Sequence, residues 1–277
     1  MLDSAEEVSR RAAELIAETV QRNPDCVLGL ATGGTPLGTY GELIRMYREG
    51  AVSFSRVTTF NLDEYVGLSA DHPQSYRYFM GVNLFQHVDL DSNRCHVPDG
   101  LAEDYDSYCT SYEDLLRKSG GIDLQLLGIG TDGHIGFNEP GSSLGSRTRL
   151  KGLTEQTVRD NARFFDSIEQ VPRLAVTMGV GTILEARRIL LIATGSNKAG
   201  AVRSFIEGPI TSQITASALQ LHPATTVLLD RAAADWLQRK EYYQHVERLQ
   251  REIELRAREP ENASSPKGRR RKGSTQK

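Results

Sequence analysis

The feature that most constrains the fold is an alternation of short apolar runs with helical patterns, from Cys26 to Asp230. Short apolar runs bounded by turn residues are typical of strands buried on both faces. Helical segments between such runs are the usual connections between parallel strands. The pattern therefore predicts an α/β chain with an open, mostly parallel sheet and helices on both faces, in one domain over residues 1–258.

The expected elements follow from periodicity and from the positions of glycine and proline. Helices are expected at residues 5–22, 37–48, 76–85, 103–118, 154–165, 179–186, 199–207 and 232–258. Strands are expected at residues 26–31, 57–62, 122–129, 174–177, 188–194 and 225–230. From Glu259 the composition turns to Pro, Asn, Ser, Lys and Arg. We expect a disordered, solubilising basic tail over 259–277, with transient nucleic-acid contact as the alternative.

Bulk composition excludes several classes of protein. The net charge of −3, with 39% hydrophobic and 25% charged residues, is typical of a globular protein and argues against a general nucleic-acid binder. No apolar run is long enough to span a bilayer. The three cysteines have no metal-ligand spacing, and the N-terminus resembles no secretory signal. We therefore expect a cytoplasmic protein with reduced thiols and no membrane partner.

The strand predicted at 122–129 breaks into glycine and then presents three ionisable side chains, Asp132, His134 and Glu139. Two carboxylates and an imidazole after a buried strand have the layout of an active site in an open α/β sheet. Imidazole titrates near neutrality, and a neighbouring carboxylate fixes its tautomer. The alternative is a turn whose polar residues cap one another.

Two junctions between a strand and a helix have the composition of anion cradles. In the first, Gly33, Gly34 and Thr35 precede a helix; in the second, Gly195 to Lys198 do. Backbone N–H groups at a helix N-terminus attract anions, and Arg163 would add a bidentate donor. Each junction alone could be an ordinary tight turn, but together they favour a phosphorylated substrate.

The strand predicted at 57–62 delivers Asp63 at its carboxyl end, where catalytic groups of such sheets gather. The alternative is a capping role for this carboxylate. The polar segment 141–151 follows the central motif and carries cations at Arg147, Arg149 and Lys151. It is either a solvated loop or a loop that binds phosphate or contacts a neighbouring subunit.

Four collinear motifs resemble the glucosamine-6-phosphate deaminase family over about residues 1–250. They are the segments 28–36, 60–65, 128–140 and 146–149, which read LGLATGGTP, FNLDEY, GIGTDGHIGFNEP and SRTR. The resemblance implies a Rossmann-like sheet of the deaminase and 6-phosphogluconolactonase type. It also implies conversion of glucosamine 6-phosphate and water to fructose 6-phosphate and ammonia, in amino-sugar catabolism that includes N-acetylglucosamine metabolism, without a metal or organic cofactor.

The resemblance also assigns roles by matched position. Asp63 would be the base that moves a proton between C2 and C1 of the sugar. His134 would open the pyranose ring, with Asp132 and Glu139 setting its protonation and orientation. The phosphate would be held by residues of the two junctions and the intervening helix: Gly33, Gly34, Thr35, Arg163 and Lys198.

Allosteric members of the family bind N-acetylglucosamine 6-phosphate at subunit interfaces, and the matching positions here are Ser142, Ser143, Arg149 and Lys151. All four residue types suit a phosphate. This match implies a homo-oligomer, with a hexamer as one form, although some relatives are monomeric and not allosteric. The C-terminal segment departs most from the family pattern.

Two other functions share parts of this pattern. A 6-phosphogluconolactonase has the same fold, but its sequence after the histidine usually reads Ala-Ser-Leu-Phe-Pro, whereas residues 135–140 here read IGFNEP. A sugar-phosphate sensor domain of a bacterial regulator would need a helix-turn-helix before the sheet. The first predicted strand begins at Cys26, which leaves too little chain for one.

Overall fold

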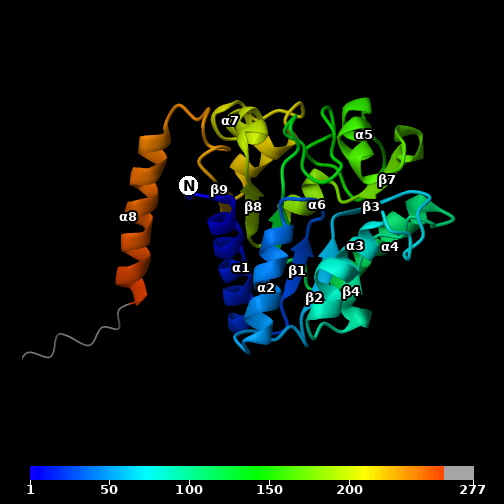
Figure 1. Ribbon diagram of the computed structural model, residues 1–277, viewed down its shortest axis with the longest axis horizontal. Helices are drawn as coiled ribbons and strands as arrows, with labels where there is room; N and C mark the ends of the chain where they lie inside the picture. The colour runs from blue at the N-terminus through cyan, green and yellow to red at the C-terminus, as the bar shows by residue number, and fades with distance from the viewer. Residues whose placement is uncertain (259–277) are drawn as a thin grey trace, which may run out of the picture. The chain divides into compact units, whose positions relative to one another are not determined.

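The computed structural model describes residues 1–258 and is built around a six-stranded parallel sheet (Figure 1). Its order is β4-β2-β1-β5-β8-β9, and every neighbouring pair is parallel. The strands are β1 (Val27–Leu30), β2 (Thr58–Asn61), β4 (Cys95–His96), β5 (Leu124–Leu127), β8 (Ile189–Ala193) and β9 (Thr225–Leu229). Parallel strands need crossover connections, and helices supply most of them here. The predicted fold class is confirmed.

The helices in the described part of the chain are α1 (Ala5–Arg22), α2 (Leu37–Arg48), α3 (Tyr76–Asn83), α4 (Tyr105–Lys118), α5 (Glu155–Asn161), α6 (Val180–Leu184), α7 (Ala199–Glu207) and α8 (Lys240–Arg258). The first of them begins with a pair of side-chain caps. Ser4 Oγ accepts the N–H of Glu7, and a Glu7 carboxylate oxygen accepts the N–H of Asp3. The apolar stripe predicted for residues 5–22 therefore starts at a defined residue.

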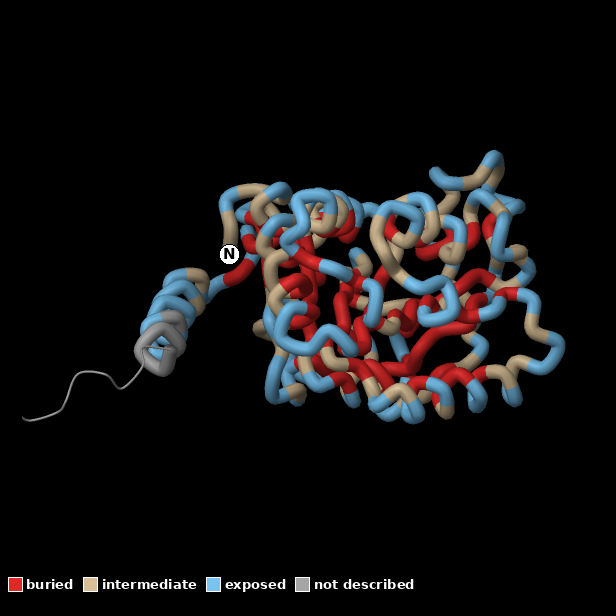
Figure 2. Tube along the Cα trace, turned by 90° about the horizontal axis from the view of Figure 1, so that it is seen from below, coloured by how far each residue is buried: buried red, intermediate tan, exposed pale blue. Residues whose placement is uncertain are grey.

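Both faces of the large sheet are covered, as the two-sided burial of its strands requires. One face packs against α1, α2 and α3 through alternate strand residues, including Leu28, Leu126 and Leu190. On the other face the ring of Tyr112 from α4 meets Phe60 of β2 edge-on, with centroids 5.6 Å apart. Figure 2 shows that the buried residues are concentrated in the interior of the molecule.

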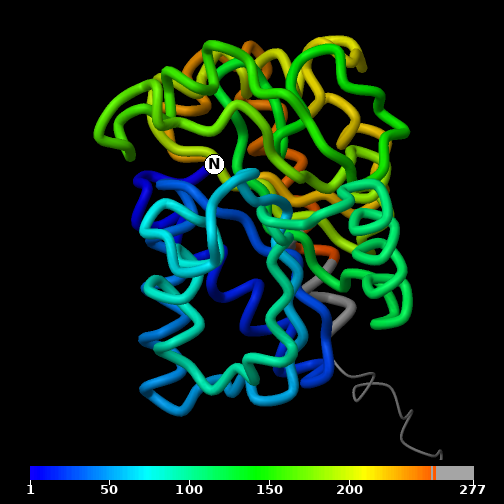
Figure 3. The backbone as a smooth tube through the Cα atoms, turned by 90° about the vertical axis from the view of Figure 1, so that its right-hand side faces the viewer, coloured from blue at the N-terminus to red at the C-terminus, as the bar shows by residue number. Residues whose placement is uncertain are grey.

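A second, three-stranded sheet was not expected from the sequence. It consists of β3 (Asp63–Tyr65), β7 (Leu174–Thr177) and β6 (Arg149–Gly152), in the order β3-β7-β6, and both pairings are antiparallel. The segment 174–177 was predicted as a strand, but it belongs to this sheet and not to the parallel one. In Figure 3 the green and yellow segments that include β6, β7 and α5 lie together above the blue and cyan N-terminal half.

Contacts divide the chain into two compact units, Met1–Leu237 and a second that begins at Gln238. The predicted single domain over residues 1–258 stays a prediction. The prediction of a helix from Ala232 was wrong: residues 231–236 form turns, and α8 begins at Lys240. No helix among residues 1–258 combines the length and the apolar character that a membrane crossing needs. The predicted tail, 259–277, lies outside the described residues.

Candidate active site

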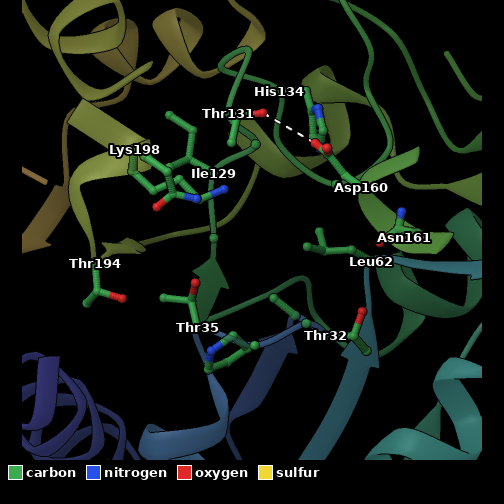
Figure 4. A pocket seen from close by; sticks show the side chains of 18 of the residues that line it. Thr32, Thr35, Leu62, Ile129, Thr131, His134, Asp160, Asn161, Thr194 and Lys198 are labelled. Atoms are coloured by element: carbon green, nitrogen blue, oxygen red, sulfur yellow. Dashed lines mark hydrogen bonds between the residues drawn. The ribbon is translucent and has the colours of Figure 1, made fainter. Parts of the chain in front are cut away.

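A cavity of about 700 Å³ lies at the carboxyl ends of the parallel strands. This is the usual position for a ligand in an open α/β sheet, and the volume is that of a small-molecule site. Figure 4 shows Thr32 and Thr35 on one side of it, Lys198 and Thr194 on a second, and His134 and Asp160 on a third. The chain therefore brings three separate motifs to one cavity.

The first motif enters from β1. Residues 31–36 line the cavity, and Gly33 has φ +100°, which a residue with a Cβ resists. The buried hydroxyl of Tyr40 on α2 donates to the carbonyl oxygen of Ala31 at 2.5 Å. This bond ties the start of the turn to the helix that follows it. Gly33, Gly34 and Thr35 therefore stand where the sequence predicted an anion cradle.

The second motif enters from β8. Gly195 has φ +90°, and its N–H donates to both carboxylate oxygens of Asp230 at 3.0 and 3.2 Å. The turn presents Lys198 to the cavity, and Arg163 lines the same cavity. Burial lowers the pKa of the Lys198 ammonium and the carboxylate of Asp160 opposes this, while Arg163 lowers it further. Two cations held in one partly desolvated cavity suit a dianionic group such as a phosphate.

The third motif contributes His134. Its Nδ1 lies 2.7 Å from Oδ1 of Asp132 and 3.8 Å from Oε2 of Glu139. The short contact is an ion pair whose angle falls outside hydrogen-bond geometry. Burial alone would lower the pKa of His134, but the carboxylates of Asp132 and Glu139 outweigh it and raise the pKa. Both oxygens of the buried Glu139 accept from Thr154, through its N–H and its hydroxyl.

Asp63 lies in β3 and lines the same cavity, with 5% of its surface exposed. Burial, the largest cause, and the neighbouring carboxylate of Glu64 together raise the pKa of Asp63 to about 8, while His134 acts in the opposite direction. A carboxylate with a pKa near neutrality takes up and releases protons readily at physiological pH. The arrangement provides a proton acceptor on one side of the cavity and an imidazole on another.

Asp132, His134 and Glu139 are the one group of three metal-ligand side chains that lie together among the described residues, with their ligand atoms within 4.8 Å of one another. At 2.7 Å, the carboxylate of Asp132 is close enough to stabilise the protonated imidazole of His134. The oxygens of Glu139 already accept from Thr154. These contacts favour a role in proton transfer, rather than in metal binding, for the three side chains.

The four residues predicted for an effector lie apart from the cavity lining. Ser142 is buried, with a side-chain oxygen that has no hydrogen-bond partner among the described residues, and Ser143 is exposed. Arg149 and Lys151 lie on β6, which the sequence presented as a loop. Burial lowers the pKa of Arg149. The structure does not bring these residues into the lining of the cavity.

Among the cavity-lining residues that sequence reasoning missed are Tyr76, Thr131 and Asp160. The hydroxyl of Thr131 donates to Oδ2 of Asp160 at 3.4 Å and so connects α5 to the loop before His134 (Figure 4). Asp160 lies three positions before Arg163, a spacing that places residues on one face of a helix. That spacing was the available signal for Asp160. Tyr76 stands at a helix start and carried no such signal.

Comparison with known proteins agrees with this geometry. A family model described as glucosamine-6-phosphate isomerases/6-phosphogluconolactonase matches residues 2–236. The glucosamine-6-phosphate deaminase of Cellvibrio japonicus is 54% identical over 90% of this chain and 94% of its own length. The enzyme of the same name from Clostridium perfringens is 55% identical over 84% of this chain and 96% of its own length.

Solved structures extend the comparison to the fold. A monomeric glucosamine-6-phosphate deaminase superposes with a TM-score of 0.84 and 51% identity, covering 85% of this chain and 98% of its own. A 6-phosphogluconolactonase from Trypanosoma cruzi superposes with a TM-score of 0.68 at 21% identity, over 86% and 96% of the two chains, and shares the fold. The chain therefore belongs to the family of glucosamine-6-phosphate isomerases and 6-phosphogluconolactonases.

Proposed function

We propose that this protein is a glucosamine-6-phosphate deaminase, which converts glucosamine 6-phosphate and water to fructose 6-phosphate and ammonia. The observation that carries the proposal is that Asp63 and His134 line one cavity together with both anion cradles. The deaminases that this chain resembles at more than half identity support the same reaction. Amino-sugar catabolism, including N-acetylglucosamine metabolism in the cytoplasm, is the setting that such a reaction would have.

In the proposed mechanism, Gly33, Gly34, Thr35, Arg163 and Lys198 bind the phosphate. Binding energy from this remote group orients C1 and C2 of the sugar at the reacting side chains. His134 takes the proton of the O1 hydroxyl and returns one to O5, which opens the ring. Its raised pKa, set by Asp132 and Glu139 against burial, suits a group that must both accept and donate.

Asp63 then takes the proton from C2 and returns it to C1, while O1 gains a proton and the nitrogen loses one. The C1 aldehyde thereby becomes a hydroxymethyl group, and C2 becomes an imine. Water adds at C2, and the amine leaves as ammonia, so that the ketose phosphate remains. The raised pKa of Asp63, about 8, makes its carboxylate a stronger base than an exposed aspartate. No step needs a Ser or Cys nucleophile.

We also propose an effector site for N-acetylglucosamine 6-phosphate at Ser142, Ser143, Arg149 and Lys151, in a homo-oligomer for which a hexamer is one form. Two observations support it: the four residues lie outside the cavity lining, and the buried hydroxyl of Ser142 has no hydrogen-bond partner within residues 1–258. The monomeric deaminase among the solved relatives makes a single-chain enzyme the competing form.

One assay tests these proposals. Ammonia release from glucosamine 6-phosphate is measured with and without N-acetylglucosamine 6-phosphate, and light scattering gives the mass of the assembly. Release supports the deaminase, and activation by the acetylated sugar in an oligomer supports the effector site. Folded protein that releases no ammonia under either condition would overturn the proposed reaction, and hydrolysis of 6-phosphogluconolactone would then be assayed.

A further inference from the structure

Glu64 is a buried carboxylate next to the proposed base that the mechanism does not use. It lies in β3 between Asp63 and Tyr65, and 2% of its surface is exposed. Asp63 lines the cavity, and Glu64 is not part of that lining. Successive side chains of a strand point to opposite sides, so Glu64 lies behind the base.

The Glu64 carboxylate joins β3 to the first turn of α3. One oxygen, Oε1, accepts the N–H of Tyr65 at 2.8 Å and the N–H of Tyr76 at 2.9 Å. The other, Oε2, accepts the N–H of Arg77 at 2.9 Å. Tyr76 and Arg77 are the first residues of α3, whose free amides and dipole favour a negative charge at this place.

These three hydrogen bonds, which we call the Glu64 clamp, also fix one wall of the cavity. Tyr76 lines the cavity, and its ring stacks on Phe137 at 5.9 Å with an angle of 12° between the planes. The same ring lies 4.9 Å from the ring of Tyr65. Through the three hydrogen bonds that it accepts from backbone amides, Glu64 therefore fixes the strand that carries Asp63 relative to the ring of Tyr76.

The charge of Glu64 acts on Asp63 as well. Burial raises the pKa of Asp63 most, and Glu64 raises it further, against His134 and the backbone amide of Phe137. Burial also raises the pKa of Glu64 itself, and Asp99 adds to that, against the three amides that it accepts. The other titratable groups near Asp63 are the hydroxyls of its aromatic neighbours: Tyr65, Tyr76 and Tyr112.

We propose that Glu64 is a positioning residue that clamps β3 to α3 and thereby holds Asp63 against the substrate in the reaction proposed above. The inference rests on Asp63 being the base. It assigns two separable contributions to one carboxylate: its length places the strand, and its charge sets how readily Asp63 takes a proton.

Two variants of the full-length protein separate these contributions. Glu64→Gln keeps the length and an oxygen that can accept from Tyr65 and Tyr76, removes the charge, and leaves the N–H of Arg77 without this acceptor. The acid limb of the pH profile of kcat/KM moves to lower pH by about half a unit or more, because the negative charge beside Asp63 is gone. Glu64→Asp keeps the charge but withdraws it from the amides of α3, so kcat falls about tenfold or more while the acid limb stays in place. In both variants KM for glucosamine 6-phosphate changes less than kcat, because the phosphate cradles are untouched.

A matched control is Glu113→Gln. Glu113 is also buried and accepts from Thr148, through both its N–H and its hydroxyl, and from the hydroxyl of Thr182, away from the cavity. This variant lowers the melting temperature and leaves the acid limb where it is. Circular dichroism and thermal melting of every variant separate loss of fold from loss of chemistry.

Three results would overturn the inference. The first is wild-type kcat in Glu64→Asp, and the second is an unmoved acid limb in a folded Glu64→Gln. The third is a loss of activity that only parallels the loss of folded protein. Failure of the proposed function is distinguishable, because wild-type protein would then release no ammonia. If Glu64→Gln does not fold, Glu64→Asp still tests the positioning role, because kcat should fall by a larger factor than the factor by which KM changes.

Discussion

Arg149 donates from Nη1 to Oδ1 of Asn138 at 2.9 Å, so a cation of the small sheet holds the loop that carries His134 and Glu139. The amide of Asn138, which has no exposed surface, donates to the carbonyl oxygens of Ile135 and Met178 at 2.9 and 2.8 Å. All the polar groups of this side chain are therefore used to fix the loop.

We predict that Asn138→Ala lowers the free energy of unfolding by about 2–4 kcal/mol, because it removes three side-chain hydrogen bonds of a fully buried residue, two to carbonyl oxygens and one from a half-buried guanidinium. It also lowers kcat, since the loop loses its anchor to β6 and to Met178. Urea denaturation gives the stability. The control is Asn83→Ala, whose half-buried amide donates only to Phe79 O within α3 and whose loss costs less than about 1 kcal/mol. Equal losses in the two variants would show that Asn138 does not anchor the loop.

We predict that Asp63→Asn nearly abolishes turnover and changes how stability depends on pH. In the folded wild type the pKa of Asp63 is about 8, above the value of about 3.9 in the unfolded chain. The stability that neutral Asp63 contributes is therefore full below about pH 4 and is lost as pH rises to about 8, at up to about 1.4 kcal/mol per pH unit. The Asn variant lacks this slope.

Chemical denaturation of both proteins across this pH range measures the effect. The variant gains stability relative to the wild type as pH rises and gains nothing more above about pH 8. Binding of inorganic phosphate serves as the control, because the cradles are unchanged and should bind it equally in the two proteins. Parallel stability curves, or comparable turnover, would remove Asp63 from the role of a buried base.

We predict that His134→Gln slows the reaction of the ring-closed substrate more than that of an open-chain analogue. The imidazole, with its pKa raised by Asp132 and Glu139 against burial, is needed only while O1 and O5 exchange protons. A stopped-flow or coupled assay on both substrates gives the ratio, with a difference of about tenfold or more expected. Equal losses on both substrates would argue that another group opens the ring.

We predict that Lys198→Met raises KM for glucosamine 6-phosphate about tenfold or more, because it removes a charged donor from a desolvated cavity. Competitive inhibition by inorganic phosphate weakens by a similar factor. The matched control is Lys118→Met, at an exposed lysine in the last turn of α4. A change of KM below about twofold in Lys198→Met would place the phosphate elsewhere.

Five strands of the large sheet could be predicted from the sequence, because each is a run rich in apolar or β-branched residues that ends at glycine or a polar turn. The edge strand β4, which is only Cys95–His96, has no such run and was not predicted. The small sheet could not be predicted. Its strand β6 reads Arg-Leu-Lys-Gly, alternately half-buried and exposed, and has no run of apolar residues. Its strand β3 is buried only because β7 and the start of α3 lie beside it, as the antiparallel pairing of Glu64 with Val176 shows. Such burial depends on distant segments, which local periodicity does not report.

The residues that line the cavity likewise divide into those that local sequence predicts and those that depend on distant contacts. Polar residues at strand ends were found because parallel strands of one sheet deliver their carboxyl ends to one edge. Tyr76 and Asp160 were not found, because whether a helical side chain reaches the cavity depends on how its helix packs. The helix expected from Ala232 was wrong for a related reason: residues 231–236 are good helix formers that tertiary context holds in turns.

The pairing of β3 with β7 also affects the order in which parts of the site form during folding. Asp63 pairs with Thr177, far along the chain, whereas β1 pairs with β2, the next strand along the chain, and the first cradle directly follows β1. Closing so long a loop is entropically costly and slow, and during synthesis it cannot begin before β7 has left the ribosome. A nascent chain would thus hold a phosphate turn well before it has a fixed base, so proton-transfer competence is among the last properties that this molecule acquires.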